Sequence, residues 1–151
     1  MKRRIAILGT PVSSGNRGVM ALGASLVGLC ARMVGVENVV LMQGHHESCQ
    51  VEYRVDGKRV RVPLVNYRLS PKARLREHLF WIVGASILYR VCGSKGLRSF
   101  LARYTPWIKA LKEADIVGDV RGGDSFSDIY GVERFLIGFF VHGRLFLLRE
   151  V

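Results

Sequence analysis

The first part of the chain alternates between apolar runs and short polar segments. Residues 4–9 form an apolar run that ends at a glycine, as the first strand of a parallel sheet does. After a polar loop, residues 19–34 carry apolar side chains at helical spacing, and residues 39–42 are again apolar. This strand–loop–helix–strand order predicts a right-handed βαβ unit. We expect the helix to lie close against the sheet through its small residues, Ala21, Gly23, Ala24, Ser25 and Gly28.

A β-hairpin is predicted next, at residues 51–62. Two runs of alternating apolar and polar residues flank Asp56-Gly57, and an Asp-Gly turn between such runs is a strong hairpin signal. We expect the hairpin to extend the sheet at its edge. The turn sets a register that opposes Tyr53 to Val60, Val51 to Val62, and Glu52 to Arg61.

The middle of the chain is basic and amphipathic. Residues 68–112 hold ten lysines and arginines and a single acid, Glu77, which gives +9 of the chain's formal net charge of +11. Residues 78–89 are uncharged, but this stretch is shorter than the roughly 20 apolar residues that a spanning helix needs. Apolar residues recur at helical spacing over 97–104, and Thr105-Pro106 is a typical helix start. We therefore predict a basic amphipathic helical segment at residues 71–112.

Two interpretations of this basic segment stay open. Its helices pack on the sheet and turn a cationic face to water, or they rest on an anionic membrane, where each Lys or Arg adds about 1 kcal/mol of binding. The membrane interpretation expects Phe80, Trp81 and Trp107 to be exposed. The sequence shows no nucleic-acid-binding motif, so we expect no nucleic-acid partner.

The last third predicts a further buried strand at residues 114–120, a polar loop at 121–128, and a helix at 129–149. That helix is apolar on nearly all sides, and such a helix expects cover on every side. Little chain remains to supply the cover. We therefore expect the complete protein to contain a second domain after this α/β domain of residues 1–151.

The first polar loop is a candidate anion site. Gly15, Asn16, Arg17 and Gly18 lead into the N-terminus of the predicted helix, where free N–H groups and the helix dipole favour an anion. Arg17 adds a guanidinium suited to phosphate or carboxylate. The loop matches neither the dinucleotide-binding fingerprint nor the P-loop. An ordinary strand-to-helix turn is the alternative.

The second polar loop is richer in chemistry. Gly122 and Gly123 permit backbone shapes that other residues avoid. One of the polar residues after them, Ser127 or Asp128, is accounted for as a helix cap. A carboxylate at a strand end beside an arginine suits a general base for a substrate hydroxyl. The loop's candidate site residues are Arg121, Gly122, Gly123, Asp124, Ser125 and Asp128.

Cysteine and histidine residues indicate no metal site. Three cysteines without a CxxC pair favour bystander thiols in a reducing cytoplasm. His78 and His142 lie on predicted apolar helices, and His45-His46 follows a strand. No signal-peptide core follows the basic N-terminus, so we expect a cytoplasmic protein, with peripheral contact at the inner face of the membrane if the basic segment binds lipid.

At the two polar loops the sequence resembles the polysaccharide pyruvyl transferase family. The matching stretches are residues 7–26, with Gly-Asn-Arg-Gly before a helix of small residues, and residues 114–131 around Gly122-Gly123. The resemblance implies the N-terminal half of a glycosyltransferase-B-type fold, in which two Rossmann-like domains with flanking helices face each other across a cleft.

The resemblance also implies an activity. The family transfers the enolpyruvyl carbons of phosphoenolpyruvate onto two sugar hydroxyls as a ketal and releases phosphate. Phosphoenolpyruvate is then the donor, no separate cofactor is expected, and the acceptor is a saccharide or lipid-linked saccharide. Arg17, Arg121 and the two loop backbones would bind the donor, with Asp124 or Asp128 as the base. We expect this chain alone to lack turnover.

Two alternatives to a pyruvyl transferase stay open. One is the acceptor domain of a sugar-nucleotide glycosyltransferase of the same two-domain architecture. The other is a basic membrane-binding module, which accounts for residues 68–112 but not for the polar loop at 121–128.

Overall fold

The computed structural model describes residues 3–10, 17–44 and 50–120. They belong to two compact units. The sheet unit comprises residues up to Tyr67 together with Glu113–Val120, and the described part of the helical unit is Arg68–Lys112.

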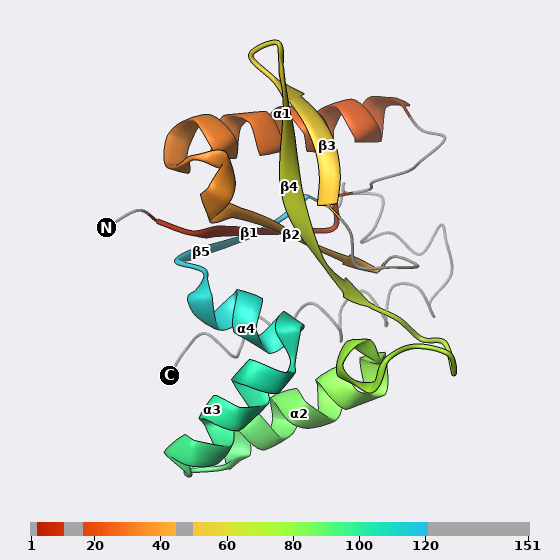
Figure 1. The fold of residues 1–151 in the computed structure, drawn as a ribbon, viewed down its shortest axis with the longest axis vertical. Helices are drawn as coiled ribbons and strands as arrows, with labels where there is room; N and C mark the ends of the chain where they lie inside the picture. The colour runs from red at the N-terminus through yellow and green to blue at the C-terminus, as the bar shows by residue number, and fades with distance from the viewer. Residues whose placement is uncertain (1–2, 11–16, 45–49, 121–151) are drawn as a thin grey trace. The chain divides into compact units, whose positions relative to one another are not determined.

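The sheet unit contains a five-stranded, mostly parallel sheet (Figure 1). The strand order is β3-β4-β2-β1-β5, in which β4, β2, β1 and β5 are parallel and β3 runs antiparallel to β4. This arrangement confirms the predicted α/β class. The strands are β1 (Ile5–Leu8), β2 (Val39–Gly44), β3 (Gln50–Val55), β4 (Lys58–Tyr67) and β5 (Ile116–Asp119).

The helix α1 (Arg17–Val34) packs on one face of this sheet and connects the parallel neighbours β1 and β2, as predicted. A short 3-10 turn, η1 (Val36–Asn38), follows it. Alternate strand residues face the helix, because side chains of a strand point to opposite faces in turn. The shared core consists of Ile5, Ile7, Val39, Leu41, Val62 and Leu64 from the strands and Val27 and Cys30 from α1.

Only two of the five small residues of α1 that were expected to lie against the sheet are buried. Gly23 and Gly28 are buried, but Ala21, Ala24 and Ser25 are exposed. The 3.6-residue period turns Ala21 and Ser25 away from the face that carries Val27, whereas Ala24, one turn before Val27, lies at the border of that face. By length and composition α1 is the one described helix that could cross a membrane, although five of its 18 residues are buried in the core.

The hairpin of β3 and β4 has the predicted register, with Tyr53 opposite Val60 and an ion pair of 3.0 Å between Arg61 Nε and Glu52 Oε1. Asp56 (φ 50°) and Gly57 (φ 78°) both adopt the left-handed backbone that the tight turn demands. The expectation of a simple edge extension was incomplete. β4 continues to Tyr67 and pairs in parallel with β2. Of the two hairpin strands, only β3 therefore lies at an edge of the sheet.

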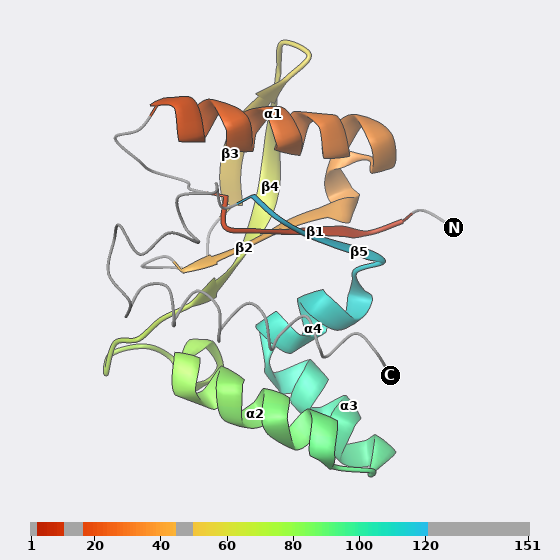
Figure 2. The same cartoon turned by 180° about the vertical axis from the view of Figure 1, so that it is seen from behind.

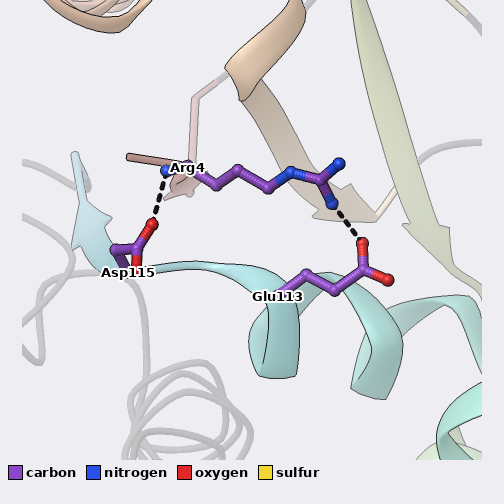
Figure 3. Close-up of polar contacts among 3 residues, drawn as sticks. All are labelled: Arg4, Glu113 and Asp115. Atoms are coloured by element: carbon purple, nitrogen blue, oxygen red, sulfur yellow. Dashed lines mark hydrogen bonds and ion pairs between the residues drawn. The ribbon is translucent and has the colours of Figure 1, made fainter. Parts of the chain in front are cut away.

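Arg4 joins β1 to the start of β5 across a long stretch of sequence (Figure 3). Its backbone N–H donates to Asp115 Oδ2 at 2.7 Å, its carbonyl accepts from the Asp115 N–H at 2.8 Å, and its guanidinium pairs with Glu113. The strand that follows is not buried as expected, since Ile116 is 41% exposed. The reason is its position: β5 is the outermost described strand on this side and has one neighbour.

The helical unit contains a 3-10 turn η2 (Leu75–Glu77) followed by α2 (Leu79–Val91) and α3 (Lys95–Tyr104), which lie side by side (Figure 2), and then α4 (Pro106–Glu113). The predicted start of α4 at Thr105-Pro106 is confirmed. The unit's apolar cluster contains Ala85, Leu101, Ala102 and Ile108, with Trp81, Tyr89 and Leu97 packed around it.

The positions of His78 and Trp107 follow from their helices. His78 is the half-buried N-cap of α2, and its Nδ1 accepts a hydrogen bond from the Phe80 N–H at 3.3 Å. Trp107, which only the membrane interpretation of the basic segment expects to be exposed, is 1% exposed. The helical period places Trp107 on the same side of α4 as the buried Leu111.

Two glycine substitutions should change stability in opposite directions. Gly57→Ala should lower the free energy of unfolding by about 1 kcal/mol, because alanine is strained at positive φ. Gly28→Ala should raise it by about 0.5–1 kcal/mol, because a Cβ there meets nothing within 4 Å and alanine favours the helix. Urea unfolding followed by circular dichroism measures both. Equal effects of the two would contradict the turn geometry.

Candidate functional site

The carboxyl ends of the four parallel strands meet at one edge of the sheet. Leu8 of β1 pairs with Met42 on one side and Asp119 on the other, so β2 and β5 end level with β1. The strand order also reverses at β1, because the chain continues to β2 on one side and later adds β5 on the other. In open α/β sheets ligands bind at this place, beyond the carboxyl ends of the strands where the order reverses.

Two buried polar atoms at this edge have no hydrogen-bond partner among the described residues. They are Thr10 Oγ1, on a residue that is 1% exposed, and Gln43 Oε1. Thr10 follows Gly9, whose φ of 73° turns the chain out of β1, and Gln43 lies one residue beyond the pair Leu8–Met42. Buried polar atoms nearly always have a partner in folded proteins. The partners of these two atoms are therefore to be sought outside the described residues, in the rest of the chain, a bound water or a ligand.

Asn66 adds a third buried polar side chain. It is opposite Gln43 in the pairing of β2 with β4 and is 1% exposed. The strand period puts both residues on the face that α1 covers, because Leu41 and Leu64, two positions earlier, belong to the core beneath that helix. The edge therefore presents neighbouring amide side chains on the α1 side of the sheet.

Tyr67 and Gly44 form the end of this strand pair. A Cβ added to Gly44 would lie 2.9 Å from Cζ of Tyr67, so the tyrosine ring occupies the space that any other residue at 44 would need. Asp119 is exposed at the end of β5, opposite Leu8. The edge thus combines an aromatic ring, an exposed carboxylate and buried hydroxyl and amide groups.

Two of the sequence-predicted site residues are described. Arg17 and Gly18 are the first residues of α1, and both are exposed. They follow β1 in the chain, as the anion-site prediction requires. The other predicted site residues lie outside the described part of the chain and stay predictions: Gly15, Asn16, Arg121, Gly122, Gly123, Asp124, Ser125 and Asp128. The predicted helix at 129–149, His142 and His45-His46 also lie outside it.

Sequence reasoning missed Thr10, Gln43 and Asn66 as site residues. The usable signal was position, because each is a polar residue at or just beyond the end of an apolar strand. The sequence pattern places Thr10 in the polar loop after the first strand and does not distinguish it from the other loop residues. It ends the hairpin strand at residue 62, so it does not predict that Asn66 lies on a strand.

The described residues contain no cluster of His, Cys, Asp or Glu that could hold a metal ion. Cys30 of α1 packs in the core between that helix and the sheet, and burial raises the pKa of its thiol. Burial also raises the pKa of Tyr53, whose hydroxyl is buried without a partner among the described residues. Tyr53 lies opposite Val60, toward the far end of β4 from Asn66.

Comparisons with protein-family models, with curated proteins and with solved structures find no match. The resemblance to the polysaccharide pyruvyl transferases accordingly stays a prediction from the two sequence stretches that carry it.

Cys30 should react slowly with alkylating reagents in the folded protein. Its raised pKa keeps the thiol protonated at pH 8, and only the thiolate reacts. Iodoacetamide labelling followed by peptide mass spectrometry should show Cys30 modified roughly tenfold or more slowly than the half-buried Cys92. In denaturant the two rates should converge. Rapid native labelling of Cys30 would show that it lies outside the core.

Proposed function

We propose that this chain is the N-terminal, acceptor-side half of a polysaccharide pyruvyl transferase with a glycosyltransferase-B-type fold. Phosphoenolpyruvate and a saccharide, free or lipid-linked, would bind at the carboxyl edge of the sheet. The observation that carries the proposal is the pair of buried polar atoms without a partner among the described residues, Thr10 Oγ1 and Gln43 Oε1, where the strand order reverses.

The two atoms suit different parts of the substrates. Phosphoenolpyruvate is a compact polyanion that offers acceptors and, when fully ionised, no donors. The Thr10 hydroxyl can donate to one of its oxygens, whereas Gln43 Oε1 only accepts. A sugar hydroxyl supplies the donor that Gln43 requires. Arg17, exposed at the first residue of α1, would add a charge-assisted hydrogen bond to the phosphate or carboxylate.

The proposed reaction needs both substrates in contact. Two sugar oxygens bond to the central carbon of the enolpyruvyl group, the bond from that carbon to the phosphate oxygen breaks, and the methylene carbon gains a proton to become a methyl group. Phosphate leaves with the electron pair. A base must accept the sugar protons, and Asp124 and Asp128 remain the candidates for that role by resemblance to the family.

Thr10→Val tests the binding role directly. Valine keeps the shape of threonine and removes a hydroxyl that has no partner among the described residues, so stability should stay unchanged or rise. Binding of phosphoenolpyruvate to the chain should weaken roughly tenfold, the loss expected when one buried hydrogen bond is removed. Thermal unfolding and isothermal titration calorimetry measure the two effects.

Tyr53→Phe is the matched control for Thr10→Val. It also removes a buried hydroxyl without a partner among the described residues, but at a position remote from the carboxyl edge. It should leave binding unchanged. If Thr10→Val leaves binding intact, the Thr10 hydroxyl does not contact phosphoenolpyruvate and the proposed site is wrong.

Arg17→Gln should separate phosphoenolpyruvate from a sugar nucleotide as the ligand. We expect phosphoenolpyruvate to bind the chain, to be unaffected by excess sugar nucleotide, and to bind roughly tenfold more weakly to Arg17→Gln. Arg59→Gln, which removes an exposed charge from the hairpin, is the control and should bind normally. Binding of the sugar nucleotide to the chain, without binding of phosphoenolpyruvate, would favour the glycosyltransferase alternative.

A further inference from the structure

The helix α2 exposes an apolar stripe on the side opposite its buried face. Phe80 is 73% exposed and Val91 is 79% exposed, and Val83 and Ile87 between them are also exposed. At 100° per residue these four side chains lie within one narrow sector of the helix. The buried residues of α2, Ile82, Ala85 and Ser86, occupy the other side.

The described part of the helical unit, Arg68–Lys112, does not use this stripe. The apolar cluster between the helices takes Trp81, Ala85 and Tyr89 from α2, and none of the four stripe residues belongs to it. Trp81 is fixed in place, because its Nε1 donates to Thr105 Oγ1 at 3.0 Å and its ring meets Tyr104 edge-on at 5.5 Å. A helix face turned only to water is normally polar, so the α2 stripe calls for an apolar partner.

Charge indicates which partner fits. The described part of the helical unit holds ten lysines and arginines against one acid, Glu77, which is itself buried. Exposed basic residues lie in sequence at both ends of α2: Arg74 and Arg76 precede it, Arg90 is in its last turn, and Lys95 begins α3. An apolar helix face with basic residues around it is the pattern of helices that lie in the interface of an anionic bilayer.

We propose that α2 lies flat on an anionic lipid bilayer, with Phe80, Val83, Ile87 and Val91 inserted at the level of the headgroups and the surrounding lysines and arginines in contact with lipid phosphates. This assignment replaces the aromatic set expected from sequence, because Trp107 is buried and Trp81 is held inside the unit. It stands independently of the proposed transferase activity. The long basic side chains can extend toward the headgroups while the apolar face is immersed.

Vesicle co-sedimentation tests the surface with the 151-residue chain. The protein should bind vesicles of phosphatidylcholine with 30 mol% phosphatidylglycerol at low salt, and bind phosphatidylcholine alone weakly. Phe80→Gln with Ile87→Gln should lower the partition coefficient roughly tenfold or more, because two exposed apolar side chains are lost. Arg90→Gln with Lys95→Gln should lower it about fivefold per charge on anionic vesicles and leave the neutral vesicles unaffected.

The matched control carries the same kind of change on the sheet unit. Leu22→Gln with Met33→Gln removes two exposed apolar side chains from α1 and should leave binding unchanged. Circular dichroism and thermal unfolding establish that each variant is folded. If the control loses as much binding as Phe80→Gln with Ile87→Gln, the interaction is general stickiness and the proposal fails. Absence of binding by the folded wild type also overturns it.

A fluorescent variant identifies the occupant of the stripe. The emission of the wild type, which comes from Trp81 and Trp107, is subtracted from that of Phe80→Trp. The added indole should then emit as a water-exposed one in free protein, and its emission should shift to the blue when anionic vesicles are added and be quenched by brominated lipid. A blue-shifted emission of the added indole before lipid is present, independent of protein concentration, would mean that another part of the chain covers the stripe. A shift that follows protein concentration, with dimers in analytical ultracentrifugation, would mean a second copy covers it. Either result overturns the proposal.

Discussion

The pairing of β1 with a parallel strand on each side is the interaction on which the sheet and the candidate site both depend. Ile5 lies opposite Val39 and Ile116, and Leu8 lies opposite Met42 and Asp119. A strand that is hydrogen-bonded on both sides can be fully buried, and all four residues of β1 are. Because both neighbours run parallel to it, their carboxyl ends fall at the same edge, and the polar residues that follow them are brought together.

The register of this pairing is held at its other end by Arg4. Its two backbone hydrogen bonds with Asp115 and its guanidinium contact with Glu113 meet at the point where α4 ends and β5 begins. The ion pair is exposed and contributes little by itself, of the order of 0–1 kcal/mol. Its structural effect is positional, because a shift of β5 by one residue would move Asp119 away from the end of β1 and exchange the faces of every β5 side chain.

The two units use apolar surface in different ways. In the sheet unit α1 covers the apolar residues on one face of the strands, and two of the buried atoms without described partners, Thr10 Oγ1 and Gln43 Oε1, are polar ones at the carboxyl edge. In the described part of the helical unit, α2 has more apolar surface than the cluster of Ala85, Leu101, Ala102 and Ile108 uses. Buried polar atoms without a hydrogen bond and exposed apolar side chains both lower the stability of the isolated fold. Their retention is explained if one set meets substrate and the other meets lipid, which are the two proposals made above.

Local sequence signals determined much of the secondary structure of this protein and the register of its hairpin. The Asp56-Gly57 turn sets the hairpin and its register, Thr105-Pro106 begins α4, and the strand–helix–strand pattern produces β1, α1 and β2. These features depend on backbone preferences and on neighbours a few residues apart, so they can be read from the chain itself. The tertiary structure decided the rest: that β4 continues beside β2, that Trp107 is buried, and that Thr10, Gln43 and Asn66 end at one edge. These outcomes depend on pairings between distant segments, such as Leu8 with Asp119, whose register is set by the packing of whole strands and not by any local pattern.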